Sequence, residues 1–313
     1  LGYQFTSDIF TDRSLSQAGY YRVPLPNRHR LLFWGSYTNS AADLKPAPFE
    51  AAGVSWQASG RYAAPLPTVA GLDHEAQAGF DFKCYDNDLE FGGTRVFTSS
   101  THVAQFAVQY GGARQDRLGS LRFEMAAYYS PGRMTNKQHE DDYQAARPYT
   151  EPEYAYGTIN VERTWRLRAD MSLVNRLAGQ LTSQRLLTSE QLGLGGYYTV
   201  RGYDERDVNA DQGLMATVEL RSPELKPGRI GGDSKLESRL QLLIFWDYGY
   251  GETRWHRSYE KQVTELMSIG GGLRFRLGEH ASLRFDYGRQ LNDVGSVRWG
   301  DRGRMHIGVV LSY

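Results

Sequence analysis

The sequence predicts an all-β fold, specifically a transmembrane antiparallel β-barrel, and three patterns support this prediction. Apolar and polar residues alternate with a period of two over many segments, which is the side-chain period of a β-strand. These segments run for about 9 to 15 residues, whereas strands of globular proteins average about five or six. Tyr, Trp and Phe cluster near the segment ends, as in the aromatic girdles of membrane barrels. We therefore expect residues 1–313 to form one barrel domain.

The polar face of the alternating segments carries charged residues repeatedly. The clearest segments, in chain order, are 76–84, 120–129, 214–220, 240–250, 268–278, 281–290 and 304–313. The charged residues that this alternation places inside the barrel include Arg122, Glu124, Glu219, Arg274, Arg276, Arg284 and Asp286. A soluble β-sandwich also alternates, with its polar face toward bulk water, and is the alternative to a barrel. The long segments, their aromatic ends and the aromatic last residue Tyr313 favour the barrel.

The connections between the segments form two classes, as in barrels that have short periplasmic turns and long outer loops. Short polar turns are expected at 24–29, 65–74, 168–171 and 277–280. Longer connections are expected at 40–52, 131–153, 186–213, 251–264 and 291–303. The alternation indicates about nine strands before the connection at 186–213 and about five after it. This makes about 14 strands, although residues 86–112 leave room for two more, and no helical periodicity is evident.

The composition argues against several classes of function. Lys and Arg number 36 and Asp and Glu number 36, so the basic excess of a nucleic-acid-binding protein is missing. The single cysteine, Cys84, allows no internal disulfide and no zinc motif, and it is best explained as a small apolar wall residue. The seven histidines lack metal-ligand spacing, and no pattern pairs one with a nucleophile. We therefore expect no cofactor, no metal and no enzymatic activity.

Two further features of the sequence bear on its organisation. The acidic stretch 139–144 could bind a cation, but a solvated loop explains it more simply. The chain starts at Leu1 without a Met or a signal sequence, from which we expect a processed or trimmed fragment. No apolar run approaches the roughly 20 residues of a membrane helix.

The densest glycine segment, "GLGGYYTVRGYDERDVNADQG", runs from Gly193 to Gly213 within the connection at 186–213. It contains "VRGY" at 200–203, follows "SEQ" at 189–191 and precedes "EL" and "SP" at 219–223, and "FWDYGYG" follows at 245–251. These motifs resemble the TpsB outer-membrane transporters of two-partner secretion, which include haemolysin activators and filamentous haemagglutinin transporters. These transporters share a superfamily with POTRA-containing barrel-assembly factors. The resemblance is strong over about 180–313 and less specific before that, and Ala210-Asp211 stands where the family usually has Gly-Asp.

The resemblance implies a barrel of 16 strands with the long loop folded into the lumen. It implies that Arg201, in the motif Val200-Arg201-Gly202-Tyr203, pairs with Asp247 beside Phe245 on the barrel wall. Alternation independently places Phe245 and Asp247 on the inward face, and an Arg fork suits a carboxylate at any relevant pH. The remaining residues of interest are the loop glycines Gly195, Gly196 and Gly213, and Tyr313 as a C-terminal insertion signal. Without the flanking motifs, an ordinary surface loop with a solvated Arg201 would be the simpler interpretation.

The resemblance implies that the protein translocates an unfolded partner exoprotein to the surface of a Gram-negative-type cell. Its other expected partners are outer-membrane lipids and, during biogenesis, the barrel-assembly machinery, with no nucleic acid. Family members carry POTRA domains before the barrel, and this chain contains none, so it corresponds to the C-terminal translocator domain. The alternatives are a barrel-assembly factor that inserts outer-membrane proteins, a passive porin or anchor barrel, and, more remotely, a barrel enzyme.

Overall fold

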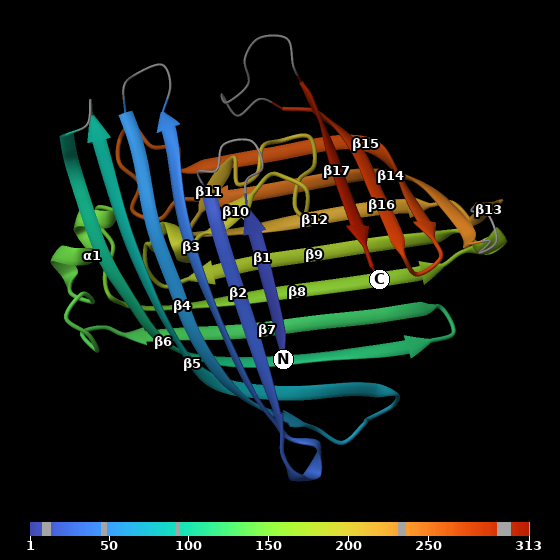
Figure 1. Ribbon diagram of the computed structural model, residues 1–313, viewed down its shortest axis with the longest axis horizontal. Coiled ribbons are helices and arrows are strands. Elements are labelled where there is room, and N and C mark those ends of the chain that lie inside the picture. The colour runs from blue at the N-terminus through green and yellow to red at the C-terminus, as the bar shows by residue number, and fades with distance from the viewer. Residues whose placement is uncertain (8–13, 45–48, 92–93, 231–235, 293–301, 313) are drawn as a thin grey trace.

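The computed structural model describes residues 1–313 apart from 8–13, 45–48, 92–93, 231–235, 293–301 and 313 (Figure 1). The expected insertion signal Tyr313 therefore lies outside the described residues. The strands are β1 Gly2–Ser7, β2 Ser14–Pro24, β3 Arg30–Leu44, β4 Phe49–Pro65, β5 Leu72–Phe91, β6 Thr94–Asp116, β7 Gly119–Pro131, β8 Glu153–Arg166, β9 Ser172–Thr182, β10 Leu192–Leu194, β11 Val208–Ala210, β12 Gln212–Arg221, β13 Leu225–Ile230, β14 Leu236–Glu252, β15 Val263–Leu277, β16 Ala281–Gln290 and β17 Gly303–Leu311. The helical elements are α1 Glu140–Ala146 and the short 3-10 turns η1 Pro26–Arg28, η2 Arg168–Asp170 and η3 Thr188–Glu190.

One antiparallel sheet contains all strands except β10 and β11, which pair with each other. Its path runs through fourteen strands in chain order, β1 to β9, then β12 and β14 to β17, while β13 lies off the path and pairs with β14. Strands β12 and β13 form one interrupted strand, because Arg221 pairs with Leu243 and Leu225 with Leu240. Pro223 lies in the interruption and has no N–H to donate to a ladder. Over the described residues, the path thus has nine strands before the long loop and five after it.

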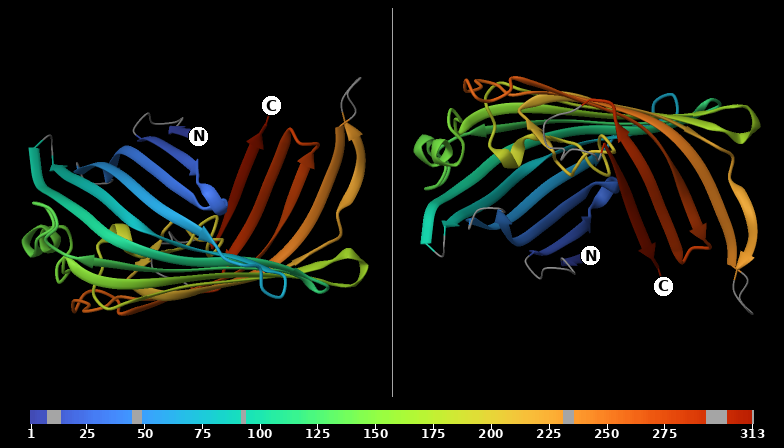
Figure 2. Two further views of the ribbon diagram at one scale, coloured as in Figure 1. Left: turned by 90° about the horizontal axis from the view of Figure 1, so that it is seen from below. Right: turned by 90° about the horizontal axis from the view of Figure 1, so that it is seen from above.

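The number of strands follows the alternation of the sequence rather than the resemblance. Residues 86–112 lie almost wholly in the long strands β5 and β6, of 20 and 23 residues, so this region adds no further strands to the path. Within the described residues the path therefore holds fourteen strands, as the alternation indicates, whereas the resemblance implies sixteen for the barrel. The described residues of β1 and β17 are not paired, so the ladder does not close between them as we expected of a complete barrel. Figure 2 shows the sheet curled, so that its first strands, in blue, and its last strands, in red, lie near each other toward the middle of both views.

The wall is apolar outside and polar inside, which is the reverse of a soluble protein. On β14, the outward residue Ile244 is 62% exposed, whereas the inward residue Asp247 is fully buried. The same pattern holds along other strands: the exposed apolar residues include Phe33, Phe106, Met125, Leu177, Ile269 and Ile307, and the buried polar ones include Arg61, Asp81, Gln105, Gln180, Glu219 and Asp286. An outward apolar band with a polar interior is the architecture of a transmembrane barrel. Among the described residues no helix is long and apolar enough to cross a membrane.

A short helix replaces the solvated loop that we expected around residues 139–144. Helix α1 starts directly after His139, and the His139 N–H donates to Asp142 Oδ2 at 3.2 Å. The three acidic residues of its first turn suit the positive end of the helix dipole. Tyr143 is fully buried and its hydroxyl donates to the His102 carbonyl at 3.0 Å, so the helix docks on β6. The stretch is too short for a helical period to show in the sequence, and its buried tyrosine, rather than its charge, determines its position.

Candidate functional site: a loop anchored inside the barrel

The loop between β9 and β12, residues 183–211, lies within the curve of the sheet (Figures 1 and 2). Strands β10 and β11 make it a hairpin, in which Leu192 pairs with Ala210 and Leu194 with Val208. Gly195 and Gly196 follow β10 with φ of +100° and +107°, a region that side-chain-bearing residues rarely adopt. The hairpin therefore turns where the sequence places these two glycines.

The base of the hairpin packs on a part of the wall that lacks side chains. Leu194 and Val200 are fully buried and form an apolar cluster with Tyr203 and Leu266. A Cβ on Gly249 of β14 would lie 2.9 Å from Val200 Cγ2, and one on Gly251 would lie 2.8 Å from Leu194 Cδ1. The inward glycines of the "DYGYG" segment therefore make the space that the loop occupies.

Arg201 is held against the inward face of β14 by Asp247. Arg201 Nε lies 2.8 Å from Asp247 Oδ2, Nη2 lies 2.8 Å from Oδ1, and the Arg201 backbone N–H donates to Oδ2 at 3.1 Å. The guanidinium carbon lies 3.4 Å from the centre of the Phe245 ring. The two-pronged geometry and the ring beneath it use the planar shape of the guanidinium, which Lys does not have. The structure thus places together the three residues Arg201, Asp247 and Phe245.

Glu219 of β12 is a second carboxylate partner of Arg201 that the motifs do not indicate. Arg201 Nη1 lies 2.9 Å from Glu219 Oε2, and the Glu219 side chain is fully buried. Arg221 Nε also donates to Glu219, at 2.6 Å, so this carboxylate binds both Arg201 of the loop and Arg221 of the wall. Residues on β12 and β14 therefore hold Arg201 from two sides. Alternation places Glu219 on the inward face, but only the fold shows that it reaches the loop.

Gly202 and Tyr203 extend the contact from β14 to β15, β16 and the last strand. Gly202 has a φ of +96°, and a Cβ there would lie 2.9 Å from the Gly288 carbonyl. Its N–H donates to His306 Nε2 at 3.1 Å, and its carbonyl accepts from Gln290 Nε2 at 2.7 Å. The Tyr203 hydroxyl lies 3.0 Å from the Met267 carbonyl. The tip of the loop thus contacts strands that follow it by up to about a hundred residues in the chain.

Gly213 differs from the other loop glycines, because it lies in β12 and not in the loop. A Cβ on Gly213 would lie 2.2 Å from the Tyr250 carbonyl, so this glycine permits close packing between strands rather than a turn. The expectation that Gly213 is a loop glycine is therefore wrong. No group of three or more His, Cys, Asp or Glu side chains in the described ranges is arranged to hold a metal ion.

Glu190, in the "SEQ" segment, anchors the upstream half of the loop to the opposite wall. Its carboxylate accepts from Lys83 Nζ at 2.8 and 2.9 Å, from the Tyr156 hydroxyl at 2.8 Å and from Gln105 Nε2 at 3.2 Å. The Glu190 side chain is almost fully buried, with 1% exposed. Lys83 comes from β5, Gln105 from β6 and Tyr156 from β8. The loop therefore bridges the lumen, with Arg201 bound to later strands and Glu190 to earlier ones.

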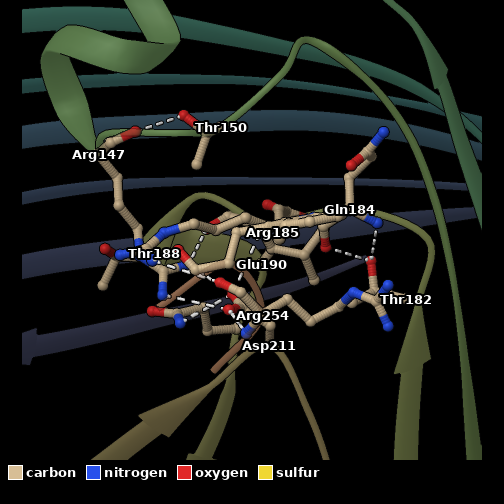
Figure 3. Close-up of polar contacts among 12 residues, drawn as sticks. Arg147, Thr150, Thr182, Gln184, Arg185, Thr188, Glu190, Asp211 and Arg254 are labelled. Atoms are coloured by element: carbon tan, nitrogen blue, oxygen red, sulfur yellow. Dashed lines mark hydrogen bonds and ion pairs between the residues drawn. The ribbon is translucent and has the colours of Figure 1, made fainter. Parts of the chain in front are cut away.

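Asp211, at the end of the loop, joins several segments near the long-loop end of the barrel (Figure 3). It pairs with Arg147, which follows α1, and Nη2 of this arginine lies 3.2 Å from Oδ2. Its Oδ1 accepts from the Leu186 N–H at 3.1 Å and from Gln191 Nε2 at 3.1 Å, while Oδ2 accepts from the Arg254 N–H at 2.9 Å. This carboxylate therefore ties the connections at 132–152, 183–211 and 253–262 together. Asp211 belongs to the Ala210-Asp211 segment, which stands where the family usually has Gly-Asp. The sequence alone did not indicate the partners of this carboxylate.

The sequence profile of the family described as "Haemolysin secretion/activation protein ShlB/FhaC/HecB" matches residues 3–275. The chain belongs to this family. The resemblance inferred from the "VRGY" and "FWDYGYG" motifs is thereby confirmed, and the chain is an outer-membrane β-barrel. The curated proteins with which the sequence was compared contain no match.

Solved structures with the same fold include other members of the barrel class. CdiB from Escherichia coli has a TM-score of 0.76 and 16% identity, with 95% of this chain and 53% of that chain covered. CdiB from Acinetobacter baumannii has a TM-score of 0.67 and 16% identity, with 99% and 52% covered. BamA from Haemophilus ducreyi lacking POTRA domains 1-3 has a TM-score of 0.60 and 10% identity, with 95% and 62% covered. The chain spans about half the length of the two CdiB chains.

Because Arg201 contacts both Asp247 and Glu219, we predict that replacing Arg201 releases the loop more than replacing Asp247 does. Arg201→Ala leaves the buried Asp247 without its cation and Glu219 with Arg221 alone, whereas Asp247→Ala leaves Arg201 paired with Glu219. Removing one partner of a buried pair costs about 3–5 kcal/mol. In planar bilayers, we expect Arg201→Ala to raise single-channel conductance more than Asp247→Ala, and the double substitution to add little to Arg201→Ala.

The matched control is Arg163→Ala, which breaks a pair with Asp116 that lies outside the loop contacts. We expect its conductance to equal that of the unsubstituted chain. Unchanged conductance in both Arg201→Ala and Asp247→Ala would show that the loop does not obstruct the lumen.

The pair of Glu190 and Lys83 predicts that removing one of the two charges destabilises the barrel more than removing both. Lys83→Met leaves Glu190 as a buried carboxylate without its cation, whereas Lys83→Met combined with Glu190→Gln leaves neutral groups that can still bond to Gln105 and Tyr156. We expect the single substitution to lower the Tm of the folded barrel, read by heat-dependent gel mobility, and the double substitution to recover part of the loss. A double variant less stable than Lys83→Met would contradict this account of the pair.

The contact between Arg185 and Glu260 predicts how the protease resistance of the connection 253–262 depends on pH. Arg185 Nη2 lies 2.6 Å from Glu260 Oε1, and this hydrogen bond lowers the pKa of Glu260 to about 2. A carboxyl whose folded pKa is depressed stabilises the fold above its unfolded pKa and loses that contribution as the pH falls toward the folded value. We expect protease cleavage within 253–262 to stay slow from pH 7 to 5 and to be faster in Glu260→Gln at both values. Equal cleavage of the two proteins would show that the contact does not restrain this connection.

Proposed function

We propose that the chain is the translocating barrel of a two-partner secretion transporter, which passes an unfolded partner exoprotein across the outer membrane. The observation that carries the proposal is the loop held inside a polar lumen by buried ionic contacts on opposite walls. Such a loop occupies part of the lumen and is fixed by ionic contacts that a passing chain can replace. Membership of the haemolysin secretion/activation family supports this assignment.

The lining of the lumen suits the passage of an extended chain. An unfolded polypeptide exposes backbone N–H and C=O groups that need polar partners or water. The inward residues of the wall are polar or charged along many strands, whereas the apolar residues face outward. A path of this kind solvates a client without offering a large apolar surface on which it would stick. We also propose that these 313 residues act as the translocator domain and that client recognition belongs to POTRA domains of the whole protein.

A barrel-assembly factor is the second candidate, because the fold is also similar to that of BamA from Haemophilus ducreyi. The two functions differ in what crosses or enters the membrane. A translocator delivers a client to the outside, whereas an assembly factor leaves new barrels in the membrane. The third and fourth candidates, a passive porin or anchor barrel and an enzyme, have no specific observation in their favour.

Secretion in cells tests the proposal. We expect the full-length protein, expressed in a Gram-negative host with its partner exoprotein, to place that exoprotein outside the cell. Arg201→Ala should reduce this release by about tenfold or more at equal barrel abundance, since losing a buried ionic anchor costs several kcal/mol. Arg163→Ala serves as the control and should secrete normally. Rescue of barrel insertion in a host depleted of its assembly factor, with no exoprotein released, would instead establish the assembly function.

A further inference from the structure

A cavity of about 950 Å³ lies between the loop and the inner face of the last strands, toward the short-turn end of the barrel. Tyr197 and Tyr198 of the loop form one side of it, and β12 to β17 form the other. Five arginines line this cavity, together with two glutamates, Glu205 and Glu224. The arginines, called here the arginine surface, are Arg221, Arg239, Arg274, Arg276 and Arg284.

The register of the sheet sets like charges directly opposite one another in this surface. Arg239 of β14 faces Arg276 of β15, and Arg274 of β15 faces Arg284 of β16. Directly opposed like charges destabilise a sheet. Two such pairs side by side are therefore not explained by the stability of the wall, and they concentrate donor groups at one place in the lumen.

Each opposed pair is bridged by a carboxylate, and Arg239 also lies 3.6 Å from a second one, Glu237. Asp286 accepts from Arg274 Nη1 at 2.7 Å and from Arg284 Nε at 2.7 Å. Glu224 pairs with Arg276 and accepts from Arg239 Nη1 at 3.2 Å. Asp286 carries one negative charge and offsets only one of the two guanidinium charges of Arg274 and Arg284. These contacts hold the arginines in place and leave positive charge available to the cavity.

The carboxylates are more hidden from the cavity than the arginines are. The side chain of Asp286 is fully buried, against 23% and 24% exposure for Arg274 and Arg284, and that of Glu224 is 35% exposed, against 42% and 55% for Arg239 and Arg276. Each guanidinium has five N–H donors in a fixed fork, of which one or two are engaged by a carboxylate. The cavity therefore presents guanidinium donors, and a ligand with oxygen acceptors complements it.

The loop itself shows how this surface engages a polypeptide. Arg284 Nη2 donates to the backbone carbonyl of Tyr197 at 2.8 Å, and the guanidinium carbon lies 3.7 Å from the centre of the Tyr197 ring. The neighbouring Tyr198 is 84% exposed. One arginine of the surface thus binds a main-chain carbonyl and an aromatic ring of an irregular segment. An incoming chain offers the same groups, and its Asp and Glu side chains offer stronger acceptors.

We propose that the arginine surface is a binding site for an extended polypeptide carrying carboxylate side chains, and that the client occupies it during passage through the lumen. This proposal rests on the proposed function, because it takes the transported chain as the ligand. Tyr197 and Tyr198 cover part of the site while the loop is in place. Client segments rich in Asp and Glu should therefore bind here in preference to segments rich in Lys.

Binding of charged peptides to the purified barrel tests the proposal. The probes are a short fluorescent peptide of alternating Glu and Ser and its counterpart with Lys in place of Glu, measured by anisotropy in neutral detergent. We expect the Glu peptide to bind at least tenfold more tightly than the Lys peptide. Arg239→Gln with Arg276→Gln should remove most of this difference, while Arg239→Lys with Arg276→Lys should retain part of it because the charge remains.

The matched control is Arg117→Gln with Arg163→Gln, which removes two charges near the same end of the barrel without touching the cavity lining. This control should bind the Glu peptide as the unsubstituted chain does, and heat-dependent gel mobility should show every variant folded. Equal binding of the two peptides, or unchanged binding in the Arg239→Gln and Arg276→Gln variant, would overturn the proposal. Displacement of the Glu peptide by millimolar inorganic phosphate would also overturn it, because the site would then be a general anion site.

This experiment separates the inference from the proposed function. Peptide binding needs no client and no secretion, so its failure leaves the test of secretion in cells unaffected. Selective peptide binding by a protein that secretes nothing in cells would overturn the proposed function alone, and the site would then have another polypeptide ligand.

Discussion

The guanidinium of Arg201 is the point on which the arrangement of the lumen depends. It is buried, it contacts Asp247 and Glu219, and it lies over the Phe245 ring. A charged group removed from water needs ionic and hydrogen-bonding partners, since its desolvation is otherwise too costly. The loop therefore has one position in which Arg201 is satisfied. Gly202 and the glycines of β14 are required because the backbone must approach the wall closely enough to reach that position.

Further contacts on the other side of the lumen attach the loop to a second wall. Glu190 carries a charge opposite to that of Arg201 and binds Lys83 on β5, so the loop is held from both walls by charges of opposite sign. Asp211 adds contacts to the outer connections through Arg147. Because these anchors are ionic, a polar environment or a competing charged chain can replace them more readily than it could an apolar interface. This property suits a loop that must be displaced when a client passes.

The arginine surface lies beside this bridge and shares its construction. Asp286 holds Arg274 and Arg284 in the way that Glu219 holds Arg201 and Arg221, with one buried carboxylate between two guanidinium groups. In both places a carboxylate bridges two arginines and so orients them both. Near Arg201 this arrangement fixes the loop, and toward the short-turn end it leaves donors open to the lumen.

The sequence by itself determined the inside-out wall, an approximate number of strands and the position of the loop's glycine turn, because alternation and backbone freedom are local properties of the chain. Family motifs also indicated the partners Arg201 and Asp247. Only the tertiary structure decided that Glu219 shares Arg201, that Glu190 reaches Lys83 and that residues 140–146 form a docked helix. These contacts join residues that are far apart in the chain. Whether two charges meet depends on the register and curvature of the sheet, and neither can be read from the spacing of residues in the sequence.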